Sequence, residues 1–462
     1  MRKSFLLLTS AALMACSAQA QKSDYGPPSE VQDIYKIAVE PSPERIYADI
    51  ETHVNFGTRH TLSETESDIR GIGAARRWIF AEFEKISKDC GGCLEVIYVS
   101  DTVEGENRIP DPTDVVNVLA IQRGSNDPNR YVMMSGDIDS RVTDPLNGTD
   151  DSPGANDNAS GMAGVIEAAR VLSKRKYAGS IIYAGLSGEE QGLFGGKIVA
   201  QYALDQGWDI DAVLNNDMIS NIEGVDGVID NTTVRVFSEG TRAVETPEEA
   251  RLRRFTGGEV DSPSRNLARY IKAQSDQYLT NLNVMMVYRL DRYRRGGHHR
   301  PFNEVGIPGI RIMETHEHYD RQHQDLRTEN GITYGDTMDG VDADYAAKLT
   351  ALNAITLAGL ADAPPFPANV EASGAVQPSA KLTWETAANA DNLAGYRVHW
   401  RLTTEPEWTH SRYIGNVNEW NFDNLVIDNY YFGVSAVAKN GSETAVVFPG
   451  PAGRFCRPAG RF

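Results

Sequence analysis

One stretch, residues 131–161, constrains the fold of this 462-residue chain more than any other. It begins with an apolar run at residues 131–134, which is typical of a buried strand. Asp137 and Asp139 follow the run, and a polar loop rich in glycine and proline continues to Gly161. Apolar residues at helical spacing come next and predict a helix. Acidic side chains therefore stand at the carboxyl end of a strand, where open α/β sheets bind ligands.

The same arrangement recurs further along the chain. Apolar runs at residues 180–186, 212–214 and 307–313 alternate with helical segments, which predicts an α/β fold with a mixed, mostly parallel sheet sandwiched by helices. Metal-capable groups accompany these runs: Asp157, Glu189, Glu190, Asp217 and His299. Several carboxylates buried at one sheet edge would repel one another and lose hydration. We therefore expect a pair of divalent metal ions at this edge, bridged by a carboxylate.

Residues 1–20 predict an export signal and not a folded element. A positively charged start precedes an apolar segment at residues 5–14, and a small-residue cleavage site ends at Ala20. The apolar segment is too short to act as a transmembrane anchor. Two outcomes stay open: cleavage, which gives a periplasmic or secreted protein, and acylation of Cys16, which gives an outer-membrane lipoprotein.

The charge and the cysteines narrow the function classes. The net charge is −19, with 64 acidic and 45 basic residues, which argues against nucleic acid as a partner because phosphates need a basic face. Cys90 and Cys93 form a C-x-x-C motif, and in an oxidising compartment this spacing predicts a local disulfide that clips a loop. Cys456 is then left single.

A proline-rich boundary at residues 361–367 separates two patterns. Beyond it, alternating runs at residues 380–384, 395–400 and 430–438 predict an all-β, immunoglobulin-like sandwich that folds as a separate unit. The expected organisation is a signal peptide at 1–20, an N-terminal arm at 21–42, an α/β domain at 43–362, the sandwich at 366–450 and a tail at 451–462.

Five motifs, in order, resemble those of the co-catalytic zinc exopeptidases, the family of bacterial leucyl aminopeptidase and glutamate carboxypeptidase II. They are GDIDS at 136–140, PGANDNASG at 153–161, SGEEQGL at 187–193, NND at 215–217 and GGHHRPFNEVGIPGIRI at 296–312. The resemblance covers residues 40–360 and implies the zinc-exopeptidase fold and a peptide substrate.

The resemblance also implies roles for single residues. Asp157 would bridge two zinc ions, and the peptide bond after it would be cis. Glu190 and His299 would bind one ion and Asp217 the other. Glu189 would act as the general base and would not itself be a ligand.

Two positions depart from the family pattern. Asp137 stands where the family has a histidine ligand, which Asp139 would orient. If Asp137 is a ligand, one ion is held by carboxylates alone, so we expect a second, weaker position suited to Mn²⁺ or Mg²⁺. His298 stands where the family has an aspartate, and it could be a surface histidine, a substrate contact or an alternative ligand.

The sequence therefore predicts an exported, metal-dependent exopeptidase, foremost an aminopeptidase that hydrolyses N-terminal peptide bonds. A water that bridges the metals would attack, and Glu189 would take its proton. One alternative is a glutaminyl-cyclase-like transferase with one zinc. Another is a non-catalytic surface-binding protein, against which the retention of Glu189 argues.

Two further segments bear on the substrate. The histidine-rich residues 314–346 are expected to shape the rim of the pocket. The C-terminal domain resembles a fibronectin type III domain, since Trp384 and the run from Tyr430 match its core signature. Such a domain could contact the substrate or a surface, but it names no function by itself.

Overall fold

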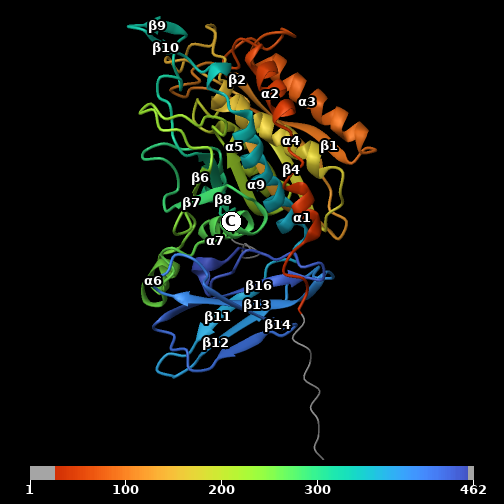
Figure 1. The fold of residues 1–462 in the computed structure, drawn as a ribbon, viewed down its shortest axis with the longest axis vertical. Coiled ribbons are helices and arrows are strands. Elements are labelled where there is room, and N and C mark those ends of the chain that lie inside the picture. The colour runs from red at the N-terminus through yellow and green to blue at the C-terminus, as the bar shows by residue number, and fades with distance from the viewer. Residues whose placement is uncertain (1–25, 456–462) are drawn as a thin grey trace, which may run out of the picture.

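The computed structural model describes residues 26–455. The expected export signal, the candidate acylation site Cys16 and the unpaired Cys456 lie outside the described residues. Figure 1 shows two units along the long axis, an α/β unit above and an all-β unit below. Among the described helices, none has the length and apolar character that a membrane span requires.

An eight-stranded sheet forms the centre of the α/β unit, with the order β1-β2-β4-β3-β5-β8-β6-β7. Its strands are β1 (Leu94–Val103), β2 (Thr113–Gln122), β3 (Asp127–Asp137), β4 (Gly179–Leu186), β5 (Asp209–Asn216), β6 (Thr233–Phe237), β7 (Asn283–Val287) and β8 (Gly309–Glu314). The four middle strands β4, β3, β5 and β8 are parallel, whereas β1–β2, β2–β4 and β6–β8 pair antiparallel. The predicted mixed, mostly parallel sheet is confirmed.

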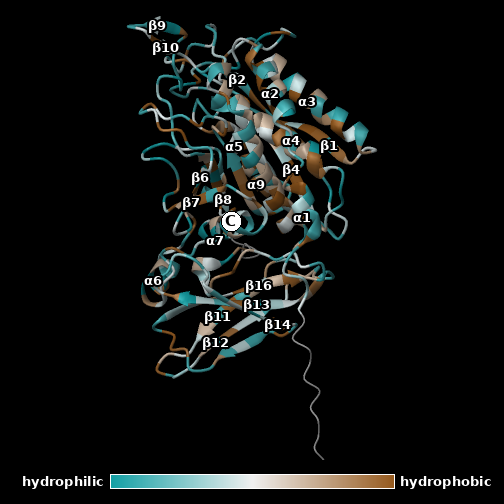
Figure 2. Ribbon diagram, viewed as in Figure 1, coloured by the Kyte–Doolittle hydropathy of each residue, from teal (hydrophilic) through white to brown (hydrophobic). Residues whose placement is uncertain are grey.

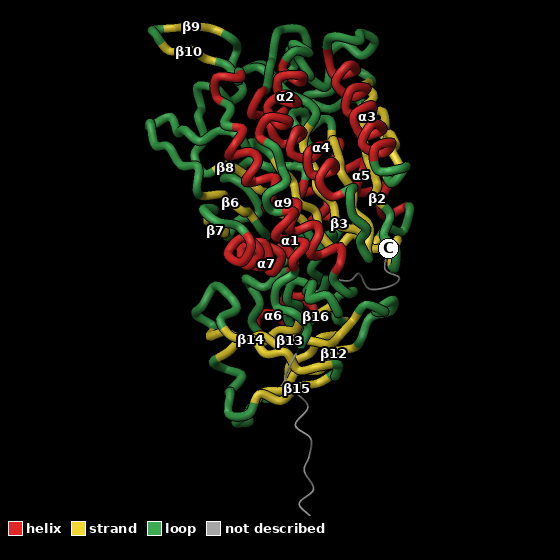
Figure 3. The backbone as a smooth tube through the Cα atoms, turned by 45° about the vertical axis from the view of Figure 1, so that its right-hand side comes forward, coloured by secondary structure: helices red, strands yellow, loops and turns green. Residues whose placement is uncertain are grey.

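Helices cover both faces of this sheet (Figures 1 and 3). They are α1 (Gln32–Ile37), α2 (Pro43–Val54), α3 (Gly71–Asp89), α4 (Gly161–Leu172), α5 (Phe194–Asp205), α7 (Pro263–Tyr278), α8 (His299–Glu304) and α9 (Ala343–Asp362). The helix α6 (Pro247–Thr256) lies beside the C-terminal unit instead and buries none of its residues. Side chains of β4 alternate between two cores: Ile181 and Tyr183 pack with α3, α4 and α9, while Ile182 and Ala184 pack with α5 and α8. Figure 2 shows the resulting apolar strands inside and polar loops outside.

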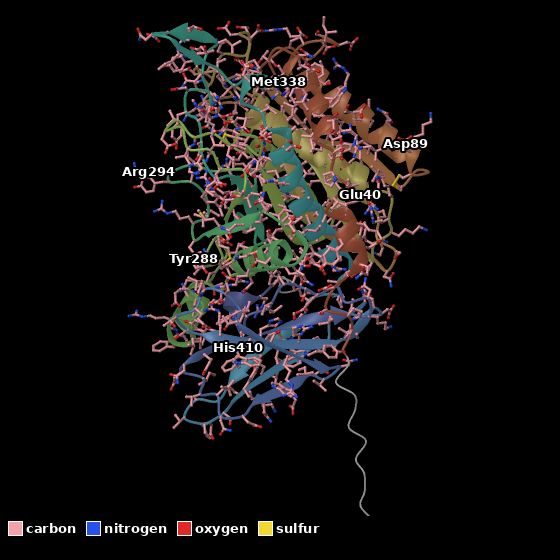
Figure 4. The ribbon with its side chains drawn as sticks, in the orientation of Figure 1. Glu40, Asp89, Tyr288, Arg294, Met338 and His410 are labelled. Atoms are coloured by element: carbon pink, nitrogen blue, oxygen red, sulfur yellow. A yellow bond between two sulfur atoms is a disulfide. The ribbon has the colours of Figure 1, made fainter. Side chains whose placement is uncertain are left out.

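The first residues described are more ordered in space than the sequence indicated. An N-terminal arm was expected over residues 21–42, but α1 lies within it and buries Ile34 and Ile37 in the main core. The apolar spacing of these two residues is one helical turn, which was too short a signal to be recognised. Cys90 and Cys93 form the predicted disulfide between α3 and β1, visible beside Asp89 in Figure 4.

The C-terminal unit consists of two three-stranded antiparallel sheets, β11-β12-β15 and β14-β13-β16. The strands are β11 (Ala368–Ser373), β12 (Ala380–Glu385), β13 (Leu393–Leu402), β14 (His410–Gly415), β15 (Glu419–Phe422) and β16 (Tyr430–Ala438). Trp384 is buried against Tyr396, whereas Tyr430 is only half-buried. An antiparallel C-terminal unit is confirmed, and its fibronectin type III identity stays a prediction.

A buried ionic contact joins the two units. Asp261 precedes α7, and its carboxylate accepts hydrogen bonds from Arg401 of β13 at 2.8 and 2.9 Å and from Arg269 of α7 at 2.8 Å. All three side chains are at least 97% buried. The guanidinium groups of Arg269 and Arg401 therefore share the carboxylate of Asp261 as their counter-charge. This buried ionic contact attaches the C-terminal unit to the α/β unit.

We expect Asp261→Ala to destabilise the protein by about 3–5 kcal/mol, because it leaves two buried guanidinium groups without their counter-charge. Urea unfolding monitored by tryptophan fluorescence measures this change. Lys381→Ala is the matched control, since it breaks the exposed pair with Glu419 and should cost no more than about 1 kcal/mol. Equal effects of the two substitutions would contradict the role of Asp261.

A second prediction concerns pH. Burial lowers the pKa of His53 from 6.5 to about 3, and Arg59 acts in the same direction. As the pH falls, the unfolded chain binds the proton first, so the stability that the neutral ring contributes is present above about pH 6.5 and is lost as the pH falls toward 3. His53→Phe keeps an aromatic ring against Trp78. Its free energy of unfolding should fall less steeply below pH 6.5, and an unchanged slope would refute this.

Candidate active site

Three side chains from separate loops converge on one point. Nε2 of His323 lies 2.9 Å from Oδ2 of Asp157 and 2.8 Å from Oε1 of Glu190. Asp157 lies in the turn η1 (Ala155–Ser160) between β3 and α4, Glu190 follows β4, and His323 lies in the loop after β8. Over residues 26–455 these three form the one group of His, Cys, Asp or Glu residues whose ligand atoms all lie within 4.8 Å of one another.

The donor set fits a single catalytic zinc ion. Two carboxylates and an imidazole are ligands that zinc takes in catalytic sites, where three protein ligands leave a fourth position for water or substrate. The three residues lie after β3, β4 and β8, three of the strands that run parallel in the sheet. Asp157 and Glu190, both predicted as ligands, therefore meet at this sheet edge together with His323, which was not among those predicted.

The side chains of Asp157, Glu190 and His323 shift one another's pKa. Burial acts to lower the pKa of His323, but Glu190 and Asp157 together raise it to about 9. Burial acts to raise the pKa of Asp157, but His323 holds it below its ordinary value. The pKa of Glu190 is also lowered by His323 against the effect of burial. The carboxylates are therefore ionised, and a proton on His323 competes with a metal ion for the same place.

A second set of contacts fixes the two glutamates. Asp139 accepts the backbone N–H of Glu189 at 3.2 Å and that of Glu190 at 3.1 Å, and it also accepts the Thr61 hydroxyl at 3.2 Å. Arg141 donates from Nε to Oε2 of Glu190 at 2.8 Å, which leaves Oε1 directed at His323. The resemblance implied that the residue at the position of Asp139 orients a histidine ligand, which this chain replaces by Asp137. In the structure Asp139 holds the backbone of the Glu189–Glu190 turn.

Asp157 is held through its backbone. The carboxylate of Asp336 accepts the N–H groups of Asn156 and Asp157, and the peptide bond between Asp157 and Asn158 is cis, as the resemblance implied. The amide side chain of Asn158 donates to Asp137 and to the carbonyl of Asn216. These contacts join η1 to the ends of β3 and β5.

Glu189 directly precedes the candidate ligand Glu190 in sequence and lies among acidic groups. Burial raises its pKa well above the ordinary value, and the carboxylates of Glu190 and Asp217 add to this. A half-buried glutamate with a raised pKa beside candidate metal ligands has the character of a general base or acid.

The remaining predicted residues have other partners. Asp137 accepts from Nδ1 of His298 at 2.6 Å. Asp217 forms an ion pair with Arg311, with Oδ2 and Nη2 2.8 Å apart. His299 directs Nε2 to the carbonyl oxygen of Leu290, at 2.8 Å, and its Nδ1 is buried without a partner.

The structure thus brings together two of the five predicted ligands, Asp157 and Glu190, and adds His323. Sequence reasoning noted the density of histidines over residues 314–346 but could not choose among them. For His298 the sequence left three roles open: a surface histidine, a substrate contact or an alternative ligand. In the structure its side chain is buried and hydrogen-bonded to Asp137. Arg311 and Arg141 carried no recognisable signal.

We expect Asp139→Ala to weaken zinc binding about 10–100-fold, because the turn that aims Glu190 loses its anchor. Competition with a fluorescent zinc chelator measures the affinity. Asp139→Asn is the matched comparison, since its amide oxygen still accepts a backbone N–H, and its loss should be smaller. Unchanged affinity in Asp139→Ala would exclude this positioning role.

Comparison with known proteins gives the following matches. Residues 117–343 match the model of peptidase family M28. A probable zinc metalloprotease of Leptosphaeria maculans is 41% identical over 92% of this chain and 98% of its own length. A probable zinc metalloprotease of Pyrenophora teres f. teres is 42% identical over 89% and 86%. The LapA aminopeptidase of Legionella pneumophila shares the fold, with a TM-score of 0.51 and 18% identity over 73% of this chain and 78% of that one.

Proposed function

This chain belongs to peptidase family M28 and is a zinc metallopeptidase, and we propose that it is an exported aminopeptidase that removes residues from the N-termini of peptides. The observation that carries the proposal is the convergence of Asp157, Glu190 and His323 beside the half-buried Glu189. The LapA aminopeptidase, which shares this fold, also supports the assignment as an aminopeptidase.

The chain's own residues account for the chemistry as follows. Asp157, Glu190 and His323 would hold the zinc, which when bound supplies polarisation of the scissile carbonyl and a lowered pKa for water. Glu189 takes a proton from the attacking water and returns it to the leaving amine. Arg141 and Asp139 keep Glu190 from turning toward the proton-transfer position, so the two adjacent glutamates keep separate tasks.

The polarity of attack is inferred from the cavity beside the site. Its lining includes the buried Glu314 and Asp336 and the partly buried Asp157, together with Arg321 and His318. Burial raises the pKa of Asp336 to about 7 and that of Glu314 well above its ordinary value. Glu314 is then uncharged near neutral pH, so the negative charge of the cavity comes from Asp157, which His323 keeps ionised, and in part from Asp336. This charge favours a substrate amine over a substrate carboxylate and supports an aminopeptidase over a carboxypeptidase.

The sandwich is proposed to act away from this cavity. Within residues 26–455, no lining residue of the cavity comes from beyond residue 340. Figure 4 shows Met338 near one end of the molecule and His410 near the other. Contact with a surface or with a distant part of a long substrate therefore suits the sandwich better than completion of the active site.

Export is proposed from residues 1–20, with secretion to the periplasm or medium and lipidation at Cys16 as the two routes. Ring closure of an N-terminal glutamine, as in a glutaminyl cyclase, is the second candidate activity, because one zinc site is formed by the three converging ligands. A panel of aminoacyl-4-nitroanilides, with glutaminyl peptides scored separately for cyclisation and for release, discriminates the two activities.

We expect Glu189→Gln to lower turnover by at least about 10², because an amide of the same size cannot take up the proton. Zinc content should stay at the wild-type value, since Glu189 lies outside the ligand group. Turnover on the best nitroanilide and zinc content are measured on the same preparation. Glu189→Asp is the comparison that keeps a carboxylate. Near-normal turnover of the glutamine variant would remove Glu189 from the mechanism.

A further inference from the structure

The acidic residues predicted to hold a second metal ion already have protein partners. Oδ1 of Asp137 lies 2.6 Å from Nδ1 of His298, and Oδ2 accepts the side-chain amide of Asn158 at 2.8 Å. Both oxygens of Asp137 are therefore used. The ring of His298 is fully buried and packs against Gly196, where a side chain would collide with it.

Asp217 is compensated by a fixed cation. Nη2 of Arg311 lies 2.8 Å from Oδ2 of Asp217. The guanidinium is fully buried, and its Nη1 donates to Asp291 at 3.1 Å and to the carbonyl oxygen of Gly296 at 3.0 Å. Arg311 is thus held from the opposite side and cannot swing into solvent to make way for another cation.

The oxygens left over are too few for a second ion. Of the four carboxylate oxygens of Asp137 and Asp217, one, Oδ1 of Asp217, has no partner. Nε2 of His298 is also buried without a partner. These two atoms do not join Asp157 in a group within 4.8 Å, since within the described residues that test is met by Asp157, Glu190 and His323 alone. A zinc site needs about three protein ligands.

We propose that this peptidase works with a single zinc ion, and that Arg311 and His298 take the place of a second ion at Asp217 and Asp137, Arg311 by its charge and His298 by a hydrogen bond. The physical reason is that buried carboxylates need compensation: the guanidinium of Arg311 supplies a counter-charge to Asp217, and the imidazole N–H of His298 supplies a hydrogen bond to Asp137. The inference deepens the proposed function and rests on it. It also accounts for the two departures at positions 137 and 298, because the two residues bond to each other.

The test is the zinc stoichiometry of the full chain. The protein is equilibrated with excess zinc, freed of unbound metal by gel filtration, and analysed for zinc and sulfur by mass spectrometry. We expect about one zinc per chain. Titration with Co²⁺, followed by its visible absorbance, should likewise saturate at about one equivalent.

Three variants show which residues bind the zinc ion. His323→Ala should lose nearly all zinc, whereas Asp217→Asn and Asp137→Asn should each retain about one ion, because neither residue is a ligand in this scheme. Two zinc ions in the wild type, or the loss of one ion in Asp217→Asn, would overturn the inference. So would retention of zinc in His323→Ala, which would place the ion elsewhere.

Activity on the nitroanilide panel is measured on the same samples and separates the two proposals. Two ions with turnover would reject the single-ion inference and leave the peptidase assignment intact. One ion without turnover on any peptide would leave the stoichiometry intact and count against the proposed function.

Discussion

The burial of many carboxylates at one edge of the sheet is the constraint on which the rest of this structure depends. Asp137, Asp139, Glu190 and Asp217 are each at least 94% buried, and Asp157 and Glu189 lie among them. Ionised carboxylates cannot be held together in a low dielectric without compensation. Different groups compensate five of these carboxylates. Asp139 is bound by backbone N–H groups, Asp137 by an imidazole and Asp217 by a guanidinium, while Asp157 and Glu190 are compensated by His323 or by a metal ion.

Loops that are far apart in sequence supply these partners. His323 lies in the loop between β8 and the small hairpin of β9 (Arg327–Glu329) and β10 (Ile332–Tyr334), which projects at the end of the molecule opposite the sandwich (Figure 1). Beyond the hairpin the same connection between β8 and α9 contributes Asp336, which follows β10 and fixes the backbone of Asp157. One long connection thus provides both a ligand and the support of another ligand, so its position decides whether the site forms.

Much of the architecture was predictable because strong local signals exist for it. Ser42 accepts from the backbone N–H of Arg45 and Pro43 occupies the first turn of α2, as expected for a helix start. The buried strands β3 and β4 were recognisable as apolar runs. By contrast, β6, β7 and the β9–β10 hairpin have five residues or fewer each, and strands this short give too little alternation to be distinguished from loops.

The sequence by itself determined the α/β class, the acidic sheet edge, the Glu189–Glu190 pair and the resemblance to zinc exopeptidases, because these depend on local patterns and spacing. The tertiary structure decided which histidine joins Asp157 and Glu190. Nothing in the sequence distinguishes His299 from His323, but the loop after β8 places only His323 in contact with both carboxylates. It also decided that Asp137 meets His298, 161 positions away, and that Arg311 meets Asp217. Pairings between distant residues follow from the way strands and loops are placed, and no local pattern encodes them.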